Sequence, residues 1–243
     1  MSDRNSIICC WVPDVGVAAA EYTAAGLPAQ SHPVESGFQH GGWRLDERYV
    51  ELLTVLDETA FGAHAYAKAW PALSDRAARA AEHGGGAIGF AVDVGDAAAT
   101  AERLRAEGRQ VLETELTFDY LGVGVHEVFV LDAPDWAPFF VTYRPPRALP
   151  PVNGVGGVDP GRLDLSAIVI ETPDPGAAAV WLGRLLRIPC IDSAIPMAGG
   201  ALVFVPGPAD RIVEVVLTGP EPAYHTIAGL RFCTLEPNPV GLR

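Results

Sequence analysis

The feature that most constrains the fold is a pattern that recurs three times along the chain. In each copy, a short apolar run with strand propensity meets an aspartate, and a helix-like stretch follows. The apolar runs are 7–12, 87–92 and 167–172, and the aspartates placed to cap the helices are Asp14, Asp96 and Asp174. Three strand candidates follow each helix, and the last of these are 49–55, 138–143 and 211–217. The pattern predicts an α+β fold of three β-α-β-β-β units.

Two segments interrupt the repeat and indicate how the chain is divided. Residues 61–82 are alanine-rich with helical spacing and join the first two units. Residues 145–161 combine several prolines with a glycine run, which is the composition of a linker. We therefore predict a domain at 1–145 that pairs the first two units, a linker at 146–160, and a third unit with an extended tail at 161–243.

The charge balance argues against two classes of partner. The chain has 243 residues with 17 basic and 30 acidic side chains, which gives a net charge of −13 at neutral pH. Binding to a phosphate backbone needs a basic face, and an acidic membrane surface would repel such a chain. The sequence also contains no run of 18 apolar residues that could span a membrane. We therefore expect a small-molecule ligand, and neither a nucleic-acid nor a membrane partner.

Smaller features indicate the compartment and argue against one cofactor chemistry. The N-terminal residues lack the order of a signal peptide, and the four cysteines match no metal spacing or disulfide framework, so we expect a cytoplasmic protein. Arginine and alanine are abundant, which is typical of a GC-rich bacterial genome. Lys68 is the one lysine and lies in a helix-like stretch, so pyridoxal or Schiff-base chemistry has little support.

Five short motifs occur in an order that resembles a known superfamily. They are Trp11-Val12-Pro13-Asp14, His40-Gly41-Gly42-Trp43, Tyr49-Val50-Glu51-Leu52-Leu53, Gly89-Phe90-Ala91-Val92-Asp93 and Pro138-Phe139-Phe140-Val141. In this order they resemble the vicinal-oxygen-chelate superfamily of glyoxalase I, bleomycin-resistance proteins and extradiol dioxygenases, and in particular bacterial glyoxalase-like domain proteins. The resemblance implies that two units pair into a curved eight-stranded sheet around a bay, which holds a divalent metal or an organic ligand. The third unit resembles the C-terminal part of such proteins, and we expect it to pair with its copy in a homodimer.

The resemblance also implies where a metal would bind. Family sites take a His or Gln from the first strand of a unit and a Glu from its last strand. Here the first-strand positions hold Ile7, Ala87 and Ala167, and the last-strand positions hold Glu51, Val141 and Glu214. The first two units thus supply one carboxylate, whereas transition metals need three or four convergent donors. We therefore expect no metal and no other cofactor. A divalent metal held by His40 or His126 in a shifted geometry stays open as an alternative.

Glu51 and His40 are the candidate catalytic residues. Strand alternation puts Tyr49, Glu51 and Leu53 on one face, and the resemblance implies that this face lines the bay. A carboxylate among apolar neighbours has a raised pKa, which suits proton transfer. The loop around His40 reaches the mouth of the bay by the same resemblance, and histidine can act as acid or base near neutral pH. Alternatively, Glu51 is solvated or paired with a nearby arginine, and His40 is a solvated loop residue.

The candidate ligand-binding residues are mostly aromatic. They are Trp43, Tyr49, His126, Phe139, Val141 and Tyr143, and Trp136 is a further aromatic candidate. Such rings could stack on a flat organic ligand, or they could belong to the core. Glu214 sits in a strand like that of Glu51, and we interpret it as a structural carboxylate.

The sequence favours a metal-independent, glyoxalase-like protein that binds or transforms an organic metabolite in an aromatic-lined bay. Lyase, isomerase or hydrolase activity and plain sequestration are all compatible with this reading. One alternative is a metal-dependent lyase or dioxygenase of the same superfamily. Another is a structural or partner-binding module, which a bay filled by the protein's own side chains would favour.

Overall fold

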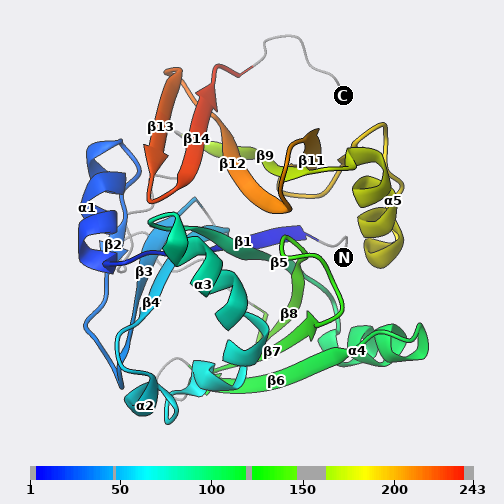
Figure 1. Ribbon diagram of the computed structural model, residues 1–243, viewed down its shortest axis with the longest axis horizontal. Coiled ribbons are helices and arrows are strands. Elements are labelled where there is room, and N and C mark those ends of the chain that lie inside the picture. Colours follow the sequence, from blue (N-terminus) through cyan, green and yellow to red (C-terminus); the bar gives the residue numbers. More distant parts are fainter. Residues whose placement is uncertain (1–3, 46–47, 119–121, 147–162, 238–243) are drawn as a thin grey trace.

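The computed structural model describes residues 4–45, 48–118, 122–146 and 163–237. Their strands form two sheets, which lie one above the other (Figure 1). Most of the predicted linker at 146–160 lies outside the described residues. In the part of the chain that is described, no helix is long and apolar enough to cross a membrane.

The first sheet has eight strands in the order β2-β3-β4-β1-β5-β8-β7-β6. The first unit comprises β1 (Arg4–Trp11), α1 (Val15–Ala24), β2 (Gln30–Ser31), β3 (Phe38–Arg44) and β4 (Tyr49–Val55), and the second comprises β5 (Gly86–Asp93), α4 (Ala97–Ala106), β6 (Val111–Phe118), β7 (Val123–Val130) and β8 (Phe139–Arg144). In each unit the first strand runs parallel to the last, and β1 and β5 pair antiparallel at the centre. The expected pairing of two β-α-β-β-β units in one eight-stranded sheet is confirmed.

The predicted aspartate caps start all three helices. The side chain of Asp14 accepts a hydrogen bond from the Val17 amide at 2.9 Å, and Asp96 and Asp174 do the same for residues three positions further on. Each carboxylate satisfies an amide that has no partner within the helix, which fixes where the helix begins.

The second sheet differs from the prediction in two details. Its strands are β9 (Asp164–Thr172), β10 (Ala194–Ile195), β11 (Ala201–Pro206), β12 (Arg211–Thr218), β13 (Ala223–Ile227) and β14 (Leu230–Leu235), and helix α5 (Pro175–Leu186) follows β9 in the chain. Across the sheet the strands lie in the order β10-β11-β9-β12-β14-β13. Strand β11, not β12, runs parallel to β9, so residues 211–217 are not the last strand of the third unit. The expected extended tail contains the β13–β14 hairpin.

Strand β12 instead begins a fourth unit that lacks a helix. It pairs antiparallel with β9 and parallel with β14, as β5 pairs with β1 and β8 in the first sheet. A turn near Gly219 stands where the other units have their helix. The second sheet therefore repeats the strand order β3-β4-β1-β5-β8-β7 of the first.

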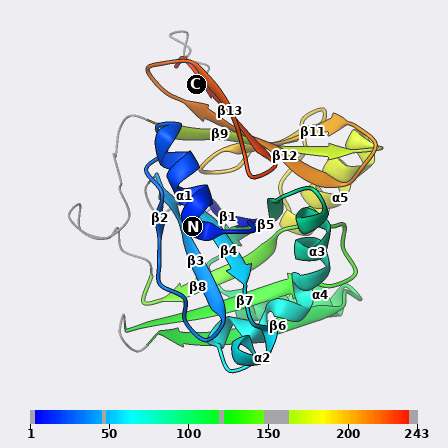
Figure 2. The same ribbon diagram turned by 60° about the vertical axis from the view of Figure 1, so that its left-hand side comes forward.

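The second sheet lies next to the first (Figure 2), and a shared apolar core joins them. Trp136, which is 2 % exposed, packs edge-on against Trp181 at 5.4 Å and against Phe204 at 5.0 Å, measured between ring centroids. Tyr22 of α1 packs in the same way against Phe232 of β14 at 5.1 Å. Because α1, α4 and α5 all contribute to this core, the two sheets share one interior.

The segment between the first two units covers the opposite face of the first sheet. It consists of α2 (Glu58–Phe61), two 3₁₀ turns, η1 (Ala65–Lys68) and η2 (Trp70–Ala72), and α3 (Ser74–Glu82). Figure 1 shows it running from α3 down to α2 along one side of the sheet. Its residues Phe61, Leu73 and Ala77 join a second buried cluster with Ile7 and Cys9 of β1. We call this segment, Glu58–Glu82, the cover.

The shared core predicts a large effect of Trp136 on stability. Trp136→Ala leaves a cavity between two rings from the second sheet and should lower the free energy of unfolding by about 3–5 kcal/mol. Leu131→Ala is the control, because Leu131 is largely exposed and its loss should change stability by less than about 0.5 kcal/mol. Urea denaturation followed by circular dichroism measures both. Equal losses in the two variants would contradict a shared core.

Candidate functional site

The bay face is the face of the first sheet that lies under the cover. The register of the strands puts Cys9 of β1 beside Glu51 of β4, and Gly42 of β3 on the other side of Glu51. Tyr49, Glu51 and Leu53 share this face, as the alternation predicts: Tyr49 and Leu53 belong to the cluster under the cover, whereas the intervening Val50 and Leu52 belong to the core between the sheets.

Glu51 is buried at the centre of the bay face, with 8 % of its surface exposed. The Cys9 thiol donates a hydrogen bond to Oε2 of Glu51 over 3.6 Å. Nδ1 of His40 lies 3.8 Å from the other carboxylate oxygen. The structure thus brings together the two residues that the sequence selected as catalytic candidates.

His40 is neutral at physiological pH. Burial lowers its pKa to about 4, and the nearby His32 and His64 add to the effect. The three histidines form a ring cluster with Phe38, in which the His32 and His40 rings are 4.6 Å apart. A neutral imidazole beside Glu51 can donate a hydrogen bond to the carboxylate, but it is a weak base.

Glu127 is a second carboxyl on the bay face, and the sequence reasoning missed it. It lies on β7 between Val125 and Phe129, which share its face, and it is 6 % exposed. Burial raises its pKa to about 7; a hydrogen bond donated by the Thr114 hydroxyl over 3.1 Å offsets part of that rise, and the charge of Glu51 adds to it. Within the described residues, Glu127 takes part in no ion pair.

Tyr66 reaches the carboxyl pair from the cover. Burial raises the pKa of its phenol well above the usual value, and the charges of Glu51, Tyr49, Glu127 and Tyr143 add to this effect. The phenol therefore stays protonated and can donate a hydrogen bond. Tyr49, Tyr66 and Tyr143 all pack against the apolar cluster of the bay face, where Glu51 and Glu127 are buried. Nothing in the sequence marks Tyr66 as a site residue, because its position depends on how the cover packs.

The remaining predicted residues of β8 lie on the bay face. Phe139 stacks on Phe129 with ring centroids 4.8 Å apart, and Val141 is fully buried beside Glu127 in the β7–β8 register. Tyr143 also packs against the cluster under the cover. Of the predicted ligand-binding residues, Tyr49, Phe139, Val141 and Tyr143 thus lie on the bay face with the two carboxyls.

Trp43 and His126 point away from the bay face, so their assignment to it is wrong. Trp43 lies opposite Val50 and packs against Phe232 of the second sheet. His126 alternates with Glu127, and its Nε2 lies 3.7 Å from Glu113 on the reverse face. Successive strand residues alternate between faces, so a residue next to a bay residue must face the other way. Trp136 lies in the core between the sheets.

The arginines near Glu51 in sequence have other contacts. Arg48 forms an ion pair with Asp164 and donates a hydrogen bond to the Gly199 carbonyl over 3.0 Å, so it links the two sheets. The guanidinium of Arg44 lies over the Tyr49 ring, 4.6 Å from its centre. Glu214 is in an ion pair with Arg231 at 3.1 Å, away from the bay face.

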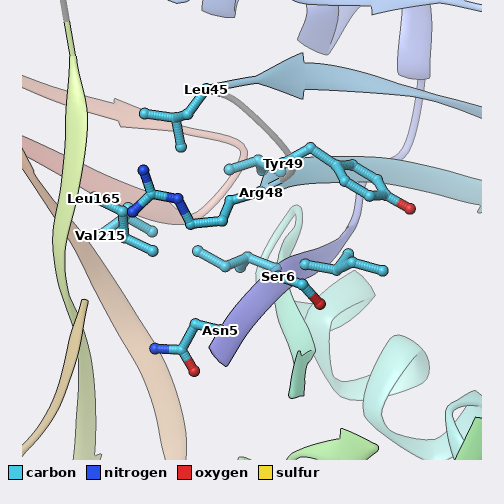
Figure 3. A pocket seen from close by; sticks show the side chains of 10 residues that line it. Asn5, Ser6, Leu45, Arg48, Tyr49, Leu165 and Val215 are labelled. Atoms are coloured by element: carbon cyan, nitrogen blue, oxygen red, sulfur yellow. The ribbon is translucent and has the colours of Figure 1, made fainter. Parts of the chain in front are cut away.

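Two hollows lie outside the bay face. A cavity of about 10 Å³ lies between the sheets beside Asn5 and Ser6, and Figure 3 shows Arg48 extending toward Leu165 and Val215 across it. It has the size of one water molecule and is too small for a substrate. A larger, open hollow of about 510 Å³ lies between Trp43 and the β13–β14 hairpin.

The donor set does not fit a metal ion. Within the part of the chain that the structure describes, no three His, Cys, Asp or Glu side chains gather so as to hold one. Of the four positions in the first two units where the resemblance implies metal ligands, Ile7, Ala87 and Val141 have no donor atoms, and Glu51 is the one carboxylate. Glu127 is one strand away from the family position, beside Val141.

The raised pKa of Glu127 predicts a pH-dependent stability. The unfolded carboxyl titrates near 4.5 and the folded one near 7. Between these values the folded protein retains a proton that the unfolded chain has released, so stability falls as the pH rises through this window and levels off above it. Glu127→Gln should therefore be more stable than the wild type at pH 8 by an amount on the order of 3 kcal/mol, and the gain should shrink toward pH 5.

Thermal midpoints from pH 5 to pH 8 test this expectation. Glu115→Gln serves as the control, because Glu115 is exposed on the neighbouring strand β6. A gain that is the same at pH 5 and pH 8, or equal in the two variants, would show that Glu127 titrates normally.

Comparisons with a family model and with solved structures place the fold among known proteins. A model of a glyoxalase-like domain matches residues 8–186. No curated protein matches the chain. Among solved structures, a hypothetical protein from Staphylococcus aureus has a TM-score of 0.74 at 10 % identity, and the match covers 96 % of this chain and 99 % of that one.

Two further solved structures are similar over most of the chain. A mutant of 4-hydroxymandelate synthase from Streptomyces coelicolor has a TM-score of 0.55 at 12 % identity, covering 90 % of this chain and 71 % of that one. The Mn(II)-bound glyoxalase from Novosphingobium aromaticivorans has a TM-score of 0.54 at 12 % identity, covering 96 % and 82 %. At these identities the structural matches establish a shared fold alone.

Proposed function

The chain belongs to the glyoxalase-like domain family of the vicinal-oxygen-chelate superfamily, and on this premise we propose that it binds a small organic molecule at Glu51 and Glu127 and transfers protons to and from it without a metal. The observation that carries the proposal is the pair of buried carboxyls on one sheet face. The pKa of Glu127 is near 7, and the charge of Glu51 is one cause of this raised value. A protonated Glu127 and an ionised Glu51 can therefore coexist at neutral pH as acid and base.

Such a pair can isomerise a substrate by moving protons. The Glu51 carboxylate takes a proton from the substrate, and the protonated Glu127 gives one back at another position. Atoms and charge then balance. The substrate keeps its composition, Glu51 ends with one more proton, and Glu127 ends with one fewer. An acid with a pKa near the working pH is the most effective donor for this role.

Other residues of the site support this chemistry. The Cys9 thiol and the Thr114 hydroxyl donate hydrogen bonds to Glu51 and Glu127, which fixes the orientation of both carboxyls. The neutral phenol of Tyr66 can donate a hydrogen bond to an oxyanion that forms on the substrate. The cover keeps bulk water from the carboxyls, which strengthens these interactions.

The donor atoms of the described residues support the metal-independent part of this proposal. The family alternative, a metal-dependent lyase or dioxygenase, needs three or four convergent donors, which the described residues do not provide. We derive no step through a metal. The homodimer and the cytoplasmic location that the sequence favours stay predictions.

The purified protein should contain much less than one equivalent of any transition metal. Elemental analysis of protein prepared without chelators measures this. Stoichiometric Zn, Ni, Fe or Mn that is lost in Glu51→Gln would contradict the proposal and restore the metal-dependent alternative.

The cover also supports a second candidate, a structural module. Phe61, Leu73 and Ala77 of the cover pack against the bay face, so the protein's own side chains occupy part of the bay. In a structural module the carboxyls would only hold the cover in place. The two candidates differ in what the removal of one charge should do.

Glu51→Gln should reduce ligand affinity or turnover at least tenfold and change stability by less than about 1 kcal/mol. Glutamine keeps the shape of the side chain and removes the charge that a substrate proton would need. Screening metabolites by thermal shift first identifies a ligand, since a ligand at 100 times its Kd adds about 2.7 kcal/mol of stability. The affinity of each variant is then measured by calorimetry.

The matched control for that experiment is Glu115→Gln, which removes an equal charge from an exposed position. A structural ion pair at Glu51 would instead cost about 3–5 kcal/mol when broken. A stability loss of this size with unchanged affinity would remove Glu51 from the site and favour the structural module.

A further inference from the structure

We propose that the front part of the cover, Glu58–Ala72, is a flap that opens when the pH falls, and that His32, His40 and His64 form its latch. The neutral imidazoles hold the flap on the edge of the first sheet, and their protonation releases it. The proposal goes beyond the proposed function, because it concerns the movement of the cover and needs no ligand. It rests on how the parts of the cover are attached to the sheet.

Hydrogen bonds anchor the chain on both sides of the flap. Before it, the Asp57 amide donates a hydrogen bond to the Gly37 carbonyl over 3.2 Å. After it, Nη1 of Arg76 in α3 donates to the carbonyls of Ala137 and Ile88 over 3.0 and 3.4 Å. The flap between these anchors can therefore move while α3 stays in place on the sheet.

The flap meets strand β3 through a group of packed rings. Phe38 of β3 lies 5.3 Å from Phe61 and 4.9 Å from His64 of the flap, measured between ring centroids. On its other side Phe38 stacks at 5.6 Å on His40, whose ring lies 4.6 Å from that of His32. The sheet edge and the flap thus contribute three imidazoles to one group of rings, in which positive charges would repel one another.

His64 also holds the start of a turn within the flap. Its Nδ1 accepts a hydrogen bond from the Tyr66 amide over 3.2 Å, which caps η1. A protonated Nδ1 cannot accept this bond, so acid removes the cap. The Tyr66 ring stacks on His64 at 5.5 Å and stays uncharged, because burial raises the pKa of its phenol. Since 3₁₀ turns as short as η1 are not stable alone, a released flap should lose its ordered backbone.

The surroundings of the histidines determine the direction of the pH effect. Burial lowers the pKa of His40 to about 4, and His32 and His64 add to this effect. Burial also lowers the pKa of His64, although the charge of Glu35 opposes it. Glu51 lies 3.8 Å from Nδ1 of His40 and does not reverse the shift. The closed flap therefore binds protons less readily than an open one, so opening is favoured as the pH falls below 6.5.

Hydrogen exchange of the full chain, followed by mass spectrometry at pH 7 and pH 5, tests the latch. A pKa of His40 that changes from 6.5 in the open flap to about 4 in the closed one predicts that the open population rises about twentyfold between these two pH values. Protection factors, which correct for the intrinsic pH dependence of exchange, should fall by at least this factor in peptides of the flap. Peptides of the central strand β5 should keep theirs.

Variants assign the effect to the histidines. In the double variant His40→Gln and His64→Gln neither side chain can take up a proton, so the fall should shrink to less than about threefold. His83→Gln is the matched control, because His83 is an exposed histidine at the other end of the cover, and it should behave as the wild type does. Circular dichroism at pH 7 shows whether each variant is folded. If the double variant is not, an NMR titration of the wild-type histidine rings decides, and a pKa of His40 near 6.5 would contradict the latch.

Three outcomes of the exchange experiment would overturn the proposal. An equal fall in peptides of the flap and of β5 would mean that acid unfolds the whole protein. An undiminished fall in the folded double variant would place the titrating groups elsewhere. A wild-type flap with the same protection at both pH values would not open in this range. The proposed function is tested separately, by the metabolite screen and the Glu51→Gln variant.

Discussion

Strand β1 is buried on both faces, and the rest of the structure depends on this. Ile8 and Cys10 point into the core between the two sheets, whereas Ile7 and Cys9 point under the cover. Because β1 pairs parallel with β4 and antiparallel with β5, its alternation sets which residues of both units face the bay. A slip of one residue would exchange the two cores, so the strong apolar pattern of β1 also fixes the position of Glu51 next to Cys9.

The sequence was most informative where a local signal repeats. The aspartate caps at Asp14, Asp96 and Asp174 mark the starts of helices, and the apolar runs before them mark first strands, so the pairing of the first two units could be predicted. The fourth unit could not, because it has no helix and therefore no cap. Strand β12, with Glu214 at its centre, resembles the last strand of a unit, and only its antiparallel pairing with β9 reveals its place.

The candidate site shows a different limit. Alternation along one strand correctly grouped Tyr49, Glu51 and Leu53, but it cannot relate the faces of two distant strands. That relation depends on register, which puts Gly42 rather than Trp43 beside Glu51, and Glu127 rather than His126 on the bay face. Glu127 had a usable signal, since a carboxylate between Val125 and Phe129 on one strand face is unusual for a buried strand. Tyr66 had none, because its position depends on how the cover packs.

The cover decides what chemistry two glutamates can perform. On an open sheet face they would be solvated and both ionised at neutral pH, which makes a poor proton donor. Packing Phe61, Leu73 and Ala77 over the bay removes water, and this desolvation is the largest cause of the raised pKa of Glu127. The same desolvation destabilises the fold whenever Glu127 is ionised. The shared core around Trp136, which the second sheet completes, offsets such a cost. The second sheet thus contributes to the site indirectly. It stabilises the first sheet, which holds two carboxyls in a buried position that is unfavourable for their charges.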